Sequence, residues 1–121
     1  MKAYEKGDYY KSTLDAVNRL RSNPDKKKAK VALAKAYPLF VTKSLGEIKR
    51  GVESNNVMHL ENNIKVYERL NNVAEEIQRS PAALEVVTEQ YTYYSELRST
   101  KELVADMAYE AGLKALEIGS M

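Results

Sequence analysis

The sequence predicts an all-α fold, and three observations carry this prediction. Apolar residues recur at steps of three and four along almost the whole chain, which is the spacing of one helix face. Alternating β-branched runs bounded by hairpin turns do not occur. Prolines and short polar stretches divide the helical pattern into segments that suit antiparallel helix-turn-helix packing. We expect a partial solenoid or a compact helical bundle with long central helices.

Length and composition indicate one folded domain over residues 1–121. Hydrophobic residues make up 44% of the chain, which is enough for a core, and there is no cysteine for disulfides or thiolate sites. The net charge is only +2, with both signs interspersed, so no strong field toward nucleic acid follows. No apolar run approaches the roughly 18 residues of a membrane span. We therefore expect neither nucleic acid nor a membrane span.

The first helix is expected to begin after Gly7, with Asp8 as its N-cap. Asn23 ends this helix, because the residue before a proline is pushed out of the α region. Asp25 is expected to cap the next helix, whose first turn holds Lys26–Lys28. The apolar face of the first helix consists of Tyr10, Leu14, Val17 and Leu20.

The second helix carries an apolar seam sustained over three heptads. Pro38 is expected to kink or split this helix near Tyr37, because proline removes a backbone donor. Gly51 and the polar stretch 54–56 mark its end. The seam consists of Val31, Ala34, Pro38, Val41, Leu45, Ile48 and Val52.

A third helix follows and should stop at Arg79, because Ser80 and Pro81 form an N-cap and first-turn signal for a short helix. That short helix runs to about Val87. Residues 88–94 are irregular, and we expect a loop or a frayed helix start there. A last helix begins at Ser95, with alanines that permit close helix approach. The two long apolar faces are Val57, Leu60, Ile64, Tyr67, Leu70, Ala74 and Ile77, and then Leu97, Val104, Ala108, Ala111, Ala115 and Ile118.

The stretch from Gly7 to Lys35 resembles the joint between two tetratricopeptide repeats, which are 34-residue helix-turn-helix units that stack into solenoids. Gly7 and Pro24 have the spacing of that family's turn glycine and closing proline, and Ser12 takes its small-residue position. The next repeat's leucine, small residue, aromatic residue and second small residue are matched by Leu33, Ala34, Tyr37 and Gly46.

The repeat pattern then fails, because Pro38 lies inside the second unit and no turn glycine occurs near Val41. Gly112 and Gly119 are spaced like a small residue and turn glycine of a further repeat, so the resemblance covers about residues 1–46 and 105–121. Both ends look cut, and we expect a fragment of a longer repeat protein. The whole is similar to repeat-containing lipoproteins of the Gram-negative cell envelope, which implies a periplasmic or cell-envelope location.

The sequence carries no recognisable catalytic, cofactor or metal-binding pattern. His59 is the only histidine, whereas a zinc site needs more nitrogen or sulfur ligands. No nucleophile-elbow glycines accompany a serine, and the five glycines are isolated rather than joined in a phosphate loop. Adjacent carboxylates such as Glu75 and Glu76 point in different directions on a helix. We expect no enzyme, no cofactor and no metal, with His59 on the surface or between helices.

The densest basic run, residues 26–30, contains four lysines. Three of them lie in the first turn of a helix, where they oppose its dipole and indicate an anionic neighbour. We interpret the run as a solvated face that Asp25 and acidic side chains of an adjoining helix neutralise. The alternative is a nucleic-acid patch, which the balanced net charge disfavours.

Tyrosine is in excess, with nine tyrosines, one phenylalanine and no tryptophan. Tyrosine is amphipathic and enriched at binding surfaces, although several here have the spacing of core residues. The irregular segment that holds three of them is as consistent with binding as with packing. The expected contacts to a partner are Tyr9, Tyr10, Tyr37, Tyr91, Tyr93, Tyr94, Lys27, Lys30 and Arg50.

Together these patterns predict a non-catalytic helical-repeat scaffold that mediates protein–protein interaction through a groove or a helix face. The alternative is a purely structural helical segment that positions other domains of a larger protein. An exposed apolar or tyrosine-rich patch of several hundred Å² would favour binding of a protein or peptide. A buried cluster around His59 would instead favour an enzyme. The sequence leaves partner identity and oligomeric state open.

Overall fold

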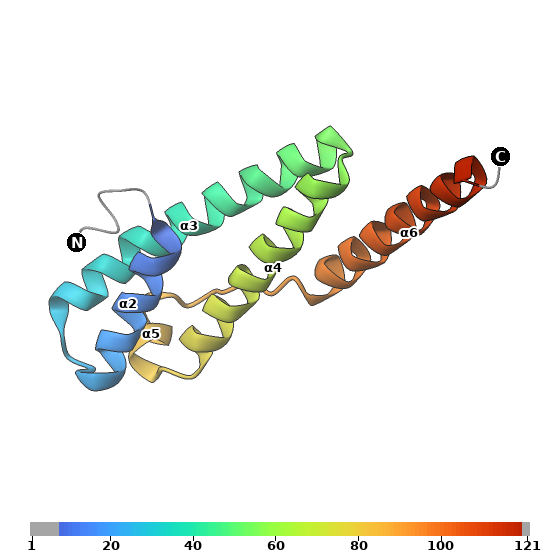
Figure 1. Cartoon of the computed structure of the whole chain (residues 1–121). Coiled ribbons are helices and arrows are strands. Elements are labelled where there is room, and N and C mark those ends of the chain that lie inside the picture. Colours follow the sequence, from blue (N-terminus) through green and yellow to red (C-terminus); the bar gives the residue numbers. More distant parts are fainter. Residues whose placement is uncertain (1–7, 120–121) are drawn as a thin grey trace.

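The computed structural model describes residues 8–119, with side chains to residue 113, and consists of five helices labelled α2 to α6 (Figure 1). The helices are α2 (Tyr9–Ser22), α3 (Lys27–Ser54), α4 (Val57–Gln78), α5 (Pro81–Val86) and α6 (Tyr94–Gly119). No strand occurs within residues 8–119, so the all-α prediction is confirmed. Gly7 and the residues before it, part of the proposed repeat joint, lie outside the described range.

Helices α2, α3 and α4 run antiparallel in succession, and α5 closes one end of the bundle (Figure 1). The core lies where these four helices meet. Its completely buried side chains include Val17, Leu20, Leu33, Val73, Ile77 and Ala83, one or two from each helix. Because burial of such side chains is the main driving force for folding, these four helices make up the stable part of the chain.

Helix α2 begins as the sequence predicts. The carboxylate of Asp8 accepts a hydrogen bond from the backbone N–H of Lys11 at 3.2 Å. Ser12 and Thr13 are fully buried, which the apolar pattern does not indicate. Their hydroxyls donate to the carbonyls of Asp8 and Tyr9 at 3.0 and 2.6 Å. These small polar residues therefore let α2 approach its neighbours without leaving buried hydroxyls unpaired.

The turn into α3 differs from the prediction. Asp25 does not cap the helix, because it lies one residue before the N-cap position, in a turn where its backbone N–H donates to Asn23 Oδ1 at 3.3 Å. The N-cap is Lys26, which makes no side-chain capping bond, and the first turn of α3 holds no acidic residue. The lysines at this end consequently face the positive end of the helix dipole without a carboxylate cap.

Pro38 lies inside α3 without splitting it, contrary to one of the two expected outcomes (Figure 1). Pro38 and Ala34 both lie on the exposed side of the helix. The carbonyl of Ala34, which the missing proline N–H leaves without its usual donor, can therefore be hydrated. The hydrogen bond that the proline removes is therefore lost at a position where water can replace it.

The core uses a different face of α3 from the predicted seam. The buried residues of α3 are Ala29, Leu33, Ala36, Tyr37, Phe40, Ser44, Ile48 and Gly51. Of the seam, only Ile48 is buried and Val41 half-buried. Helix α3 therefore has two apolar faces, and α2, α4 and α5 cover one of them.

The α3–α4 hairpin depends on one left-handed residue and one close helix approach. Asn55 has φ 48°, a conformation that asparagine tolerates at a helix C-terminus. Further back, Gly51 faces the buried side chain of Asn63, whose Nδ2 donates to the Ile48 carbonyl at 2.9 Å. A Cβ on Gly51 would lie only 2.3 Å from the Asn63 side chain, so this crossing requires glycine.

Helix α6 packs on α4 and then leaves the bundle (Figure 1). Its half-buried residues, at steps of three and four, are Leu97, Thr100, Val104 and Met107, and none of its described side chains is fully buried. Farther along, Tyr109 and Leu113 are 69% and 42% exposed. Ala108 and Ala111 are exposed, contrary to the expected close helix approach, while Ala115 and Ile118 lie beyond the described side chains.

We expect Gly51→Ala to destabilise the protein by about 1–3 kcal/mol, because the new methyl group displaces a buried, hydrogen-bonded asparagine. Gly46→Ala in the same helix is the matched control, since its Cβ would have nothing nearer than Arg50 Nη1 at 3.6 Å. The control should be neutral or stabilising by up to about 1 kcal/mol, from helix propensity. Urea unfolding followed by circular dichroism measures both. Equal stability of the two variants would contradict the close crossing.

Candidate functional site

The outer face of α3 carries a row of uncovered apolar residues, called here the outer seam. It consists of Val31, Pro38, Leu45 and Val52, which lie seven positions apart and are all exposed. Val31, Leu45 and Val52 are 53%, 41% and 60% exposed. Isolated exposed apolar residues are ordinary, but a row with a helical period along one face is typical of a surface that binds another helix.

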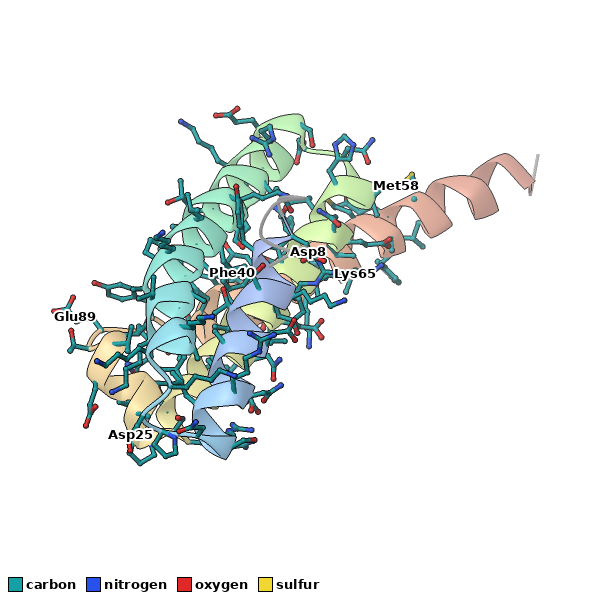
Figure 2. The ribbon with its side chains drawn as sticks, turned by 90° about the vertical axis from the view of Figure 1, so that its left-hand side faces the viewer. Asp8, Asp25, Phe40, Met58, Lys65 and Glu89 are labelled. Atoms are coloured by element: carbon teal, nitrogen blue, oxygen red, sulfur yellow. The ribbon has the colours of Figure 1, made fainter. Side chains whose placement is uncertain are left out.

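A groove of about 470 Å³ continues from the outer seam between α3 and the segment that follows α5. Pro38 belongs to both features. The remaining groove residues are Ala34, Tyr37, Val41 and Thr42 on α3, with Val86, Val87, Thr88, Glu89 and Tyr91 opposite. Figure 2 shows Glu89 at the rim of the molecule beside α3. The groove is mainly apolar and widens the surface that the outer seam offers.

Two of the predicted contact residues, Tyr37 and Tyr91, line this groove. Tyr37 is 8% exposed and belongs mostly to the core, with one edge on the groove. Tyr91 is 56% exposed, and its hydroxyl donates to the Glu89 carboxylate at 2.9 Å. Tyr91 can therefore contact a bound molecule, whereas Tyr37 supports the groove from below.

Tyr9 and Tyr10 lie on another side, at a hollow of about 320 Å³ between the start of α2 and the middle of α3 and α4. The Tyr10 ring packs on Phe40, which lies between α3 and α2 (Figure 2), with centroids 5.6 Å apart. The guanidinium of Arg69 lies 5.3 Å from the Tyr10 ring centroid, a cation–π contact. Lys43 lies 5.8 Å from the Tyr9 ring centroid. Both tyrosines are thus engaged in packing between helices.

Tyr93 and Tyr94 anchor the start of α6 on α4. The backbone N–H of Tyr93 donates to Asn71 Oδ1 at 2.6 Å, and its ring lies 5.9 Å from that of Tyr67. The Tyr94 hydroxyl donates to the Glu75 carboxylate. These contacts hold in place the linker between α5 and α6, residues 87–93, so both tyrosines have a structural role in addition to any contact with a partner.

The predicted basic contacts do not form one site either. Lys27 is exposed at the first turn of α3, and Lys30 pairs with Glu85 of α5 at 3.8 Å. Arg50 lies near the other end of α3. The sequence interpretation missed Lys28, Lys35 and Lys49, which lie beside the outer seam. Their spacing of seven and fourteen residues is visible in the sequence, but only the burial of the opposite face shows that they are outside.

His59 takes part in the end of the α3–α4 hairpin. Its Nδ1 lies 2.9 Å from Ser54 Oγ, whose hydroxyl donates to the Gly51 carbonyl at 2.8 Å. Because the Ser54 hydroxyl donates its proton to the Gly51 carbonyl, the His59 imidazole is the donor in its hydrogen bond to Ser54. A histidine that activates a serine nucleophile has to accept the hydroxyl proton, so this hydrogen bond runs in the wrong direction for that role. Asn56 Oδ1 completes the turn by accepting the Met58 and His59 N–H groups at 2.8 and 3.4 Å.

Burial and acidic neighbours raise the pKa of several tyrosines around the linker. Burial raises the pKa of Tyr37, against the effect of a backbone hydrogen bond at Tyr91. Burial and then the Glu96 carboxylate raise the pKa of Tyr67 and of Tyr93. The Glu89 hydrogen bond raises the pKa of Tyr91. All four phenols are therefore neutral at physiological pH and can act as hydrogen-bond donors.

Within residues 8–113 the structure brings together no group of three metal-binding side chains. No helix in the described part of the chain is long and apolar enough to cross a membrane. Neither a protein-family model, nor a curated protein, nor a solved structure matches this sequence.

We expect the free energy of unfolding to decrease as pH rises above about 10. The folded-state pKa of Tyr37 is raised, so the unfolded chain loses this proton first and the folded state is progressively disfavoured. Tyr37→Phe should reduce this alkaline decline, as measured by urea unfolding between pH 8 and 11. Tyr109→Phe, on a side chain that is 69% exposed, is the control and should retain it. The same decline in both variants would show that Tyr37 does not contribute.

Proposed function

We propose that this protein is a non-catalytic helical scaffold that binds a protein or peptide partner through the outer seam and the adjoining groove. The observation that carries the proposal is the second apolar face of α3. Its residues Val31, Leu45 and Val52 are 41–60% exposed although their spacing is that of a helix contact. A fold gains nothing by itself from such a row, whereas a bound helix or peptide would bury it.

The groove supports the same proposal. Tyr91 presents an exposed aromatic ring beside apolar residues of α3, and aromatic anchors at a pocket rim are typical of binding hot spots. The resemblance to repeat-containing envelope lipoproteins favours the periplasm or cell envelope as the place of action. Neither a cofactor nor nucleic acid is part of this proposal.

A second candidate function is a purely structural segment that positions other domains. The half-covered helix α6 favours it, because none of its described side chains is buried and Tyr109 and Leu113 are exposed. A helix of this kind can extend toward a neighbouring domain. The two candidates differ in which apolar surface matters, the outer seam or the far half of α6.

Peptides selected from a random displayed library on the wild-type protein distinguish the two. We expect Leu45→Asp to weaken the binding of such peptides at least tenfold, about 1.4 kcal/mol, because it puts a charge into the middle of the outer seam. Met58→Asp is the matched control, since Met58 is a 75% exposed apolar residue that belongs to α4 and not to the outer seam. Fluorescence anisotropy measures affinity, and circular dichroism checks folding.

If the selected peptides bind the Leu45→Asp variant with the same affinity as wild type, the outer seam is not their binding site. If Leu113→Asp on α6 then abolished their binding, the structural candidate would be favoured instead. Both substitutions are on exposed helix positions, where changes in folding stability are small.

A further inference from the structure

We propose that the partner of the outer seam is an acidic amphipathic α-helix; this rests on the proposed function and adds the chemical class of the partner. Two rows of side chains on α3 carry the proposal. One is the apolar row of the outer seam, and the other is a row of lysines beside it.

The apolar row has the period of helix pairing. Val31, Pro38, Leu45 and Val52 are seven residues apart, which is the repeat that keeps two supercoiled helices in contact. The row spans about 32 Å at 1.5 Å per residue, or roughly three heptads of a partner. An extended peptide repeats every two residues and cannot match this spacing. The shape therefore selects a helix.

The lysine row repeats with the same period. Lys28, Lys35 and Lys49 each precede an outer-seam residue by three positions, and Thr42 takes the same place before Leu45. All four are exposed, and within the described part of the chain the three lysines form no ion pair. These positions correspond to the flanking sites where paired helices place opposite charges.

The charge of α3 as a whole agrees with an anionic partner. The helix holds six lysines and one arginine against two glutamates, although the chain carries a net charge of only +2. Lys27 and Lys28 lie in a first turn that has no acidic residue, where they oppose the helix dipole. Glutamates on a docked helix would relieve that repulsion and face the lysine row.

Nucleic acid fits the surface less well. A phosphate backbone would satisfy the lysines but would leave the apolar row, at 41–60% exposure for its three large aliphatic members, facing a charged polymer. A helix with leucines on one side and glutamates on its flank satisfies both rows at once.

Three designed 21-residue peptides test the proposal by fluorescence anisotropy. The first has leucines at heptad spacing flanked by glutamates, the second has the same leucines flanked by lysines, and the third is a scrambled form of the first. We expect wild type to bind the acidic amphipathic peptide at least tenfold more tightly than either of the others. Raising the salt concentration from about 0.05 to 0.5 M should reduce the difference in affinity between the first two peptides, because salt screens the charges on their flanks.

Charge reversal gives the decisive comparison. The triple variant K28E/K35E/K49E should prefer the basic peptide, which inverts the wild-type order. The control K11E/K65E/K101E changes net charge equally at exposed lysines of α2, α4 and α6 and should keep the wild-type order. Circular dichroism establishes that both variants fold.

Three outcomes would overturn the inference: an unchanged order in K28E/K35E/K49E, inversion in both triple variants, or equal binding of the scrambled peptide. The inference would also be overturned if wild type bound a DNA duplex more tightly than the acidic peptide and only K28E/K35E/K49E, not the control variant, lost that binding. The lysine row would then be assigned to nucleic acid. The proposed function fails on a separate result, namely if Leu45→Asp leaves the affinity of the library-selected peptides unchanged. If those peptides respond to Leu45→Asp while the designed acidic helix does not bind, the surface is correct and the partner class is wrong.

Discussion

Burial of one face of α3 is the interaction on which the rest of this structure depends. Helices α2, α4 and α5 all pack against α3, and Leu33 and Phe40 lie where they meet. If α3 had a single apolar stripe, this packing would bury all of it. Helix α3 has a second stripe, so covering the first necessarily turns the second to solvent. The outer seam is thus a consequence of how the core forms, and the proposed binding surface follows from it.

Buried polar residues then decide how closely the helices approach and where the linkers run. Asn63 is 1% exposed and fills the space that Gly51 leaves open, which sets the α3–α4 crossing. Asn71 is 4% exposed and holds the Tyr93 backbone, which fixes the end of the linker from α5. The position of that linker against α3 creates the groove. Each asparagine has one buried polar atom without a hydrogen-bond partner in the described structure, so packing rather than full polar satisfaction retains them.

The two unevenly covered helices differ in chemistry. Helix α3 is basic, and its uncovered face has a regular heptad of apolar residues with lysines beside it. Helix α6 is half-covered by α4, and its exposed apolar residues, such as Tyr109 and Leu113, do not form a continuous heptad row. Regular spacing and an excess of basic residues make α3 the better surface for specific recognition, while the shape of α6 suits a connection to other structure.

Local chemistry in the sequence determined the helices themselves. Asp8 and Ser80 are N-caps, Asn55 and Asn56 end one helix and begin the next, and their side chains act over a few residues, so each boundary could be predicted from its neighbours. The sequence could not predict which face of α3 is buried, because both faces have helical apolar spacing. The choice depends on where α2, α4 and α5 fit. At Asp25 two local signals compete, since the Asn23 side chain holds the Asp25 backbone N–H and the N-cap position falls to Lys26. The tertiary structure alone decided that the heptad seam and its lysines face outward, because only one side of a helix can meet the core.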